Sequence, residues 1–71
     1  MKGFIEIENV YGNKTIINIR YIVAIESIQE KTSMTEYRFV RFVYVYNLEP
    51  IKTFETYEEI KQKIKEAQEQ K

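Results

Sequence analysis

The order of apolar and polar residues predicts a pair of strands at the start of the chain. Between residues 3 and 10, isoleucines alternate with glutamates, which is typical of a strand with one buried and one exposed face. Residues 11–14 contain a glycine and an asparagine, which accept positive φ angles, so we expect a hairpin turn there. A return strand over residues 14–19 follows, and residues 18–21 are expected to form a corner.

Three further strands are predicted in the middle of the chain. Residues 22–30 are rich in isoleucine and valine, and a polar loop separates them from residues 37–46. This second segment gives the strongest strand signal, because nearly every residue in it is aromatic or β-branched. A turn that contains Pro50 then leads to a short strand over residues 51–54.

A C-terminal helix is expected over about residues 56–68, where the period of the pattern changes. Thr56 precedes Glu59 by three residues, as in a capping box, in which each side chain accepts a hydrogen bond from the backbone N–H of the other residue. The apolar residues that follow recur at helical spacing and define one face, made of Tyr57, Ile60, Ile64 and Ala67.

These elements predict one small α+β domain over residues 1–71, with the strands within residues 3–54. We expect an antiparallel meander of four to five strands closed by a single helix. A twisted sheet with the helix on one face and a small curled barrel both satisfy the pattern, so the sequence leaves this choice open.

The composition excludes the common kinds of catalytic and metal site. The chain has 71 residues, with no His, Cys or Asp and only two isolated glycines. It therefore lacks the residues of a Ser-His-Asp or Cys-His site, the usual zinc ligands, a disulfide and a glycine-rich phosphate loop. We expect a protein that is not an enzyme and that has no catalytic residues, no metal and no cofactor.

The charge balance and the lengths of the apolar runs bear on location. Eleven basic residues balance eleven acidic ones, whereas nucleic acids and anionic membranes attract proteins with a net positive surface. The longest run without a charge, Phe42 to Leu48, is too short for a transmembrane helix. Glu6 and Glu8 interrupt any signal-peptide core. We expect a cytoplasmic protein without membrane insertion.

The strand over residues 37–46 is the first candidate for function. Both of its faces are apolar enough to need cover, but a single helix covers only one. Either the sheet curls and covers its second face itself, or that face or the strand edge binds another protein, most simply as a homo-oligomer. Tyrosine and arginine are favoured in protein interfaces. The candidate interface consists of Phe39, Arg41, Tyr44 and Tyr46.

Arg41 lies in the middle of this strand among apolar neighbours. Its side chain either extends to the edge of the sheet or pairs with a glutamate of an adjacent strand or a second subunit, for which Glu26 is the expected partner. In the second case, replacing Arg41 by alanine is expected to destabilise the fold or the assembly by about 1 kcal/mol or more.

The alternative function is a nucleic-acid-binding module that uses Arg38, Arg41 and the tyrosines of the strand. Residues 38–45 faintly resemble the aromatic RNP1 strand of an RNA recognition motif, since Phe42 fits. However, Phe39 stands in place of the motif's glycine. The fold of an RNA recognition motif also needs two helices, and this sequence predicts only one. We therefore do not expect nucleic acid to be the main partner.

A family resemblance rests on the pattern G-x5-N-x3-I-x2-I-E, formed by Gly12, Asn18, Ile22, Ile25 and Glu26. It resembles the small flagellar and swarming-motility proteins of the FlbD type, which share the order of a hairpin, an Asn-x3-Ile corner, a second hairpin and a short helix. The segment 54–60 is similar to the closing segment of that family. The resemblance spans most of residues 4–64 and implies this architecture and a role in motility. Residues 31–50 depart from it, because they are longer and lack the family's Asn-Gly turn.

Overall fold

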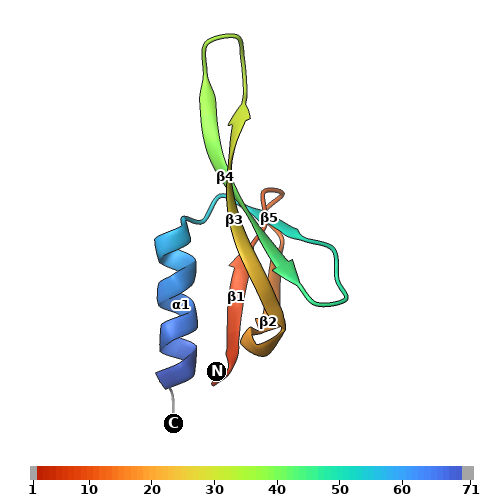
Figure 1. Cartoon of the computed structure of the whole chain (residues 1–71), viewed down its shortest axis with the longest axis vertical. Coiled ribbons are helices and arrows are strands. Elements are labelled where there is room, and N and C mark those ends of the chain that lie inside the picture. The colour runs from red at the N-terminus through yellow and green to blue at the C-terminus, as the bar shows by residue number, and fades with distance from the viewer. Residues whose placement is uncertain (1, 70–71) are drawn as a thin grey trace.

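The computed structural model describes residues 2–69, which form five strands and a C-terminal helix (Figure 1). The strands are β1 (Phe4–Glu8), β2 (Lys14–Asn18), β3 (Ile22–Lys31), β4 (Tyr37–Val45) and β5 (Ile51–Thr53). A short 3-10 helix, η1 (Ile19–Tyr21), joins β2 to β3, and α1 (Tyr57–Glu69) follows β5. All strand pairs are antiparallel, so the fold is α+β, as the hydrophobic pattern predicts.

The strands form two separate, open sheets and not the single meander or curled barrel that was expected. One sheet contains β1 and β2, and the other has the order β3-β4-β5. The predicted corner at residues 18–21 explains the separation. The Asn18 side chain accepts a hydrogen bond from the Arg20 N–H (2.9 Å) and starts η1, which turns the chain away so that β2 and β3 do not pair.

The hydrophobic core lies between the two sheets and the helix. Its buried residues are Ile5, Ile7, Ile17, Val43, Val45, Ile60 and Ala67. The isoleucines of β1 point into this core and its glutamates point out, because successive side chains alternate across a strand. The core uses only one face of the three-stranded sheet, which we call the inner face; the opposite face is the outer face.

The capping box at the start of α1 is confirmed. The Glu59 N–H donates to Thr56 Oγ1 (3.1 Å), and the Thr56 N–H donates to Glu59 Oε1 (3.2 Å). The hydrogen bond that the Glu59 carboxylate accepts from the Thr56 N–H favours the charged form and holds the pKa of Glu59 below its ordinary value. Of the predicted apolar face, Ile60 and Ala67 are buried, whereas Tyr57 remains 44% exposed.

The β3–β4 hairpin extends well beyond the rest of the fold (Figure 1) and makes the molecule elongated, with extents of 48 × 23 × 20 Å. The strand β5 pairs with β4 only over residues 41–43. Residues 28–40 therefore form a two-stranded ribbon with its end loop, which we call the arm.

Candidate interaction surface

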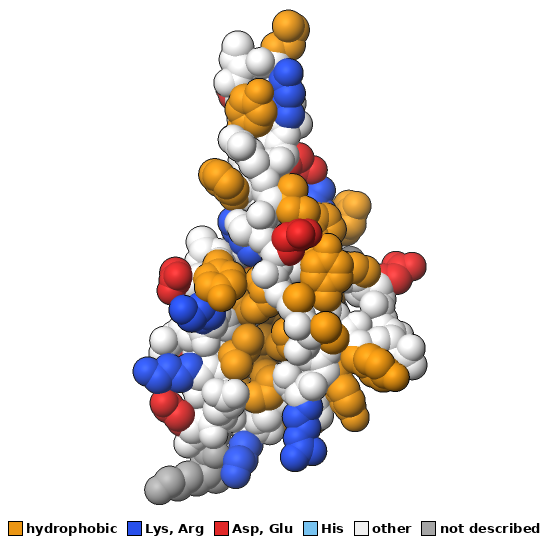
Figure 2. All heavy atoms as spheres, in the orientation of Figure 1, with side chains coloured by type: hydrophobic (Ala, Val, Ile, Leu, Met, Phe, Trp, Pro, Cys, Tyr) orange, Lys and Arg blue, Asp and Glu red, His pale blue; other side chains and the backbone are white. Residues whose placement is uncertain are grey.

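The arm carries aromatic side chains into solvent. Tyr37 and Phe39 lie on the inner face of β4, in line with its core residues, but they are 56% and 58% exposed. They remain exposed because the helix and the two-stranded sheet end below the arm (Figure 1). Met34, in the end loop, is 89% exposed. Figure 2 shows hydrophobic side chains along the arm and over the centre of the molecule.

The base of the arm is attached to β5 on the outer face. The Glu30 carboxylate accepts hydrogen bonds from Lys52 Nζ (2.7 Å) and Arg38 Nε (2.8 Å), which together hold the pKa of Glu30 below its ordinary value. The Arg38 guanidinium also lies 4.8 Å from the centroid of the Phe54 ring, a cation–π contact. Val40 lies on the same face and is only 1% exposed, so the outer face has a buried apolar residue at the base of the arm.

The remainder of the outer face is polar and aromatic, and it is only half-buried. The Tyr44 hydroxyl donates to Glu26 Oε1 (3.0 Å), and this hydrogen bond to a carboxylate raises the pKa of Tyr44. The Phe42 and Tyr44 rings are 6.4 Å apart, centroid to centroid, and tilted by 34°. Because the sheets stay open, the expectation that the sheet covers its second face by curling is not met.

The structure does not bring the four predicted interface residues together. Phe39 and Arg41 lie on the inner face of β4, whereas Tyr44 lies on the outer face. Tyr46 follows the end of β4 and is 66% exposed. Phe39 and Tyr44 thus present surface to solvent on opposite faces of β4, and only Phe39 belongs to the arm.

Arg41 is buried and fully engaged within the fold. Its side chain is 8% exposed, and it donates from Nε to the Glu55 carbonyl and from a terminal nitrogen to the Phe54 carbonyl, both at 2.7 Å. The expected partner, Glu26, bonds Tyr44 instead, because Glu26 lies on the outer face. Arg41 therefore joins β4 to the segment that leads into α1, and we leave it out of the interaction surface.

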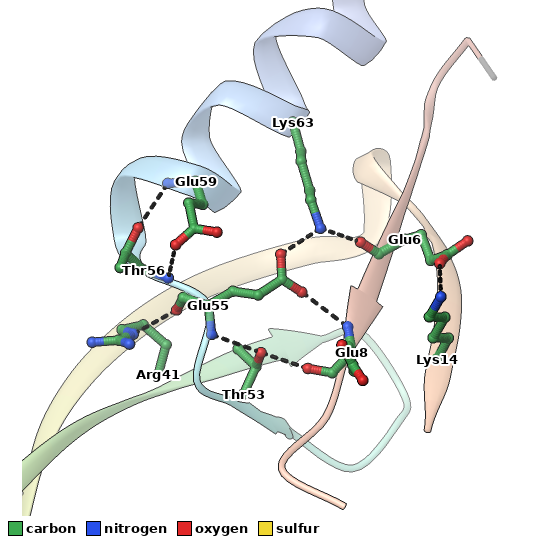
Figure 3. A network of polar contacts seen from close by, with 9 residues as sticks. All are labelled: Glu6, Glu8, Lys14, Arg41, Thr53, Glu55, Thr56, Glu59 and Lys63. Atoms are coloured by element: carbon green, nitrogen blue, oxygen red, sulfur yellow. Dashed lines mark hydrogen bonds and ion pairs between the residues drawn. The ribbon is translucent and has the colours of Figure 1, made fainter. Parts of the chain in front are cut away.

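Side chains from β5, from the segment between β5 and α1, and from α1 itself bond the free edge of β1 (Figure 3). The Glu8 N–H donates to Glu55 Oε2 (2.9 Å), and the Glu8 carbonyl accepts from Thr53 Oγ1 (2.6 Å). Lys63 donates to the Glu6 carbonyl (2.7 Å) and to the Glu55 carboxylate. Because these backbone groups already have hydrogen-bond partners, they are not available for pairing with another strand.

The free edge of β3 has no such cover. Within residues 2–69, the backbone of residues 23–31 bonds only to β4. At the arm's end the Thr32 N–H donates to the Glu36 carbonyl (3.0 Å). Because bonded and non-bonded pairs alternate along an antiparallel ladder, the even residues 24 to 30 direct their backbone groups at β4. Residues 25, 27, 29 and 31 direct theirs at the open edge.

Sequence reasoning missed both the closed edge and the open one. Thr53, Glu55 and Lys63 meet β1 only through the tertiary fold, and Glu55 differs in no local way from the other glutamates around the capping box. The segment of β3 was predicted as a strand, but its pattern does not tell an edge strand from a central one. The sheet order supplies that information.

The described residues contain no cluster suited to metal chemistry. No group of three or more metal-binding side chains occurs within residues 2–69. In the same part of the chain, no helix is long and apolar enough to cross a membrane. What the surface offers is a strand edge and aromatic side chains, and both are means of binding other molecules.

Comparison with known proteins adds no relative. No protein-family model, no curated protein and no solved structure matches the chain. The resemblance to proteins of the FlbD type therefore stays a prediction.

Proposed function

We propose that the protein is a non-enzymatic accessory or adaptor protein that acts through protein–protein contacts and associates with itself. The observation that carries this proposal is the open edge of β3 beside the exposed aromatic side chains of the arm. An unpaired edge presents a row of N–H and C=O groups to another strand, and natural proteins close such edges when they are not used. In this chain, side chains close the edge of β1 but not that of β3.

The surface chemistry supports a protein partner over nucleic acid. Arg41 is buried and donates to two carbonyls, so it is not part of the surface. Arg38 is exposed but already pairs with the Glu30 carboxylate, with which a phosphate would have to compete. The formal net charge is zero, which gives no long-range attraction to a polyanion. Nucleic-acid binding through the strand of residues 37–46 is the alternative that the experiment below also tests.

The test is the mass of the protein in solution, measured by light scattering after size exclusion over a hundredfold range of concentration. The wild-type mass is expected to rise above that of one chain. Phe39→Ser should weaken this association, because it removes an exposed aromatic side chain from the arm. Tyr11→Ser is the matched control, since Tyr11 is 84% exposed in the turn between β1 and β2 and is not one of the residues of the arm.

The dependence of binding on salt concentration distinguishes protein association from nucleic-acid binding. Contacts between apolar surfaces are not weakened by added salt, whereas binding to phosphates falls steeply as salt rises. A wild-type protein that stays monomeric at every concentration contradicts self-association. A monomer that binds single-stranded oligonucleotides in a salt-sensitive way supports the alternative.

A further inference from the structure

We propose that the partner on the open edge of β3 is a second copy of the chain, paired antiparallel with β3 of the first about a two-fold axis at Ser27. This inference rests on the proposed function and specifies its geometry. It joins the two three-stranded sheets into one continuous six-stranded sheet. The same edge is used by both copies, so the assembly closes as a dimer and leaves no β3 edge open.

A second copy fits because the edge is long and contains no Pro, one of the residues that protect strand edges. The edge carries three charged side chains, Glu26, Glu30 and Lys31, and a bulge between Ile22 and Ala24, and these features limit the registers in which a second strand can pair. Antiparallel pairing about Ser27 places the outward backbone groups of residues 25, 27 and 29 of one copy opposite those of residues 29, 27 and 25 of the other. The edge of β2 offers only five residues.

The charges on β3 select the register. With the axis at Ser27, residues 23–31 of both copies pair, and Glu26 lies opposite Ile28 of the second copy. Moving the axis by one residue places Glu26 opposite Glu26 or opposite Glu30 of the second copy, and like charges directly opposite are destabilising. Moving it by two residues avoids this clash but shortens the paired stretch.

The same register places the arm of each copy beside the second copy. Because the axis is perpendicular to the sheet, the inner faces of both copies lie on the same side. Gln29, which lies opposite Phe39 within one copy, then lies opposite Ile25 of the second copy. The arm of each copy is thereby placed beside the body of the other, on the side where the helix and the core lie. Phe39, Gln29 and Ile25 of the second copy then form one row across the inner face, with Gln29 between the two apolar side chains.

The register can be read by cross-linking, because the chain contains no cysteine. In a hydrogen-bonded antiparallel pair the Cα atoms are about 5.5 Å apart, within the range of a disulfide. Ser27→Cys is therefore expected to give a covalent dimer under mild oxidation. Gln29→Cys is the matched control, exposed on the same strand, and its two copies would be offset by four residues, or about 13 Å. It is expected not to cross-link.

Association measurements complete the test. Ser27→Pro removes an N–H that points at the open edge and leaves pairing with β4 intact, so it should raise the dissociation constant at least tenfold. Ser27→Ala keeps that N–H and should leave the constant unchanged. Glu26 lies diagonally opposite Glu26 of the second copy, so Glu26→Gln and added salt should both strengthen the dimer.

The outcomes separate this inference from the function on which it rests. A wild-type dimer in which Ser27→Cys does not cross-link, or in which Gln29→Cys does, overturns the register and leaves self-association standing. A wild-type protein that is monomeric throughout overturns both. A covalent Ser27→Cys dimer, together with weakened association of Ser27→Pro and normal association of Ser27→Ala, supports the paired edges.

Discussion

Replacing Arg41 by alanine removes a guanidinium that donates to two backbone carbonyls from a buried position. A hydrogen bond that involves a charged group contributes about 1.5–3 kcal/mol, so the lower value for both bonds gives about 3 kcal/mol. A chain of 71 residues has a free energy of unfolding of about 4–10 kcal/mol. Arg41→Ala is therefore expected to remove a large part of the total stability.

Arg38→Ala is the matched control, because it removes the same charge from the same strand. The Arg38 side chain is 49% exposed and pairs with a Glu30 side chain that is 31% exposed, so solvent screens the pair. Its loss is expected to cost about 1 kcal/mol, including the contact with Phe54. Arg41→Lys keeps the charge but lacks the planar guanidinium that donates to two carbonyls at once. Its free energy of unfolding should lie between those of the two alanine variants.

The assay is urea unfolding followed by circular dichroism at one fixed protein concentration, since self-association adds to apparent stability. With a slope of about 1 kcal/mol per M, the midpoint of Arg41→Ala should fall by about 3 M. Equal midpoints for the two alanine variants, or a loss below about 1 kcal/mol for Arg41→Ala, would show that the two carbonyl bonds do not stabilise the fold as argued.

Three further results are expected. Thr56→Ala should lower the free energy of unfolding by about 1 kcal/mol in the same assay, because it removes the cap of α1. Folding lowers the pKa values of Glu30 and Glu59, so their contribution to the free energy of unfolding is complete above the ordinary value of 4.5. This contribution is lost as the pH falls through the folded pKa values. A variant with Gln at both positions should therefore lose less stability than the wild type when the protein is titrated with acid. Glu55→Ala should speed hydrogen exchange of the Glu8 amide, whereas Glu55→Gln keeps an acceptor and should preserve protection; equal exchange in both would contradict the closed edge.

The local elements could be predicted from the sequence because their signals are local. Alternation along β1 and the aromatic run of β4 define strands, and Thr56 and Glu59 define the start of the helix. The corner at residues 18–21 was also predicted. The consequence of this corner, two sheets in place of one, could not be predicted, because a turn signal does not say which strands pair after the turn.

The candidate surface was predicted in part. The exposure of Phe39 and Tyr46 agrees with their selection from an aromatic strand. Arg41 was expected to pair with a side chain, but its partners are backbone carbonyls, which every residue carries and which no sequence pattern singles out. The open edge of β3 depends on sheet order, which is set by contacts between distant segments.

The closed edge of β1 has a consequence for folding during synthesis. The groups that close it come from far along the chain, since Glu55 lies 47 positions after Glu8 and Lys63 lies 57 positions after Glu6. The hairpin of β1 and β2 therefore leaves the ribosome with an unprotected edge and keeps it until Glu55 and Lys63 have been made. Any nascent or cleaved chain that ends before Glu55 presents this edge in addition to that of β3. Such fragments are the species from which aggregation of this protein is expected to start.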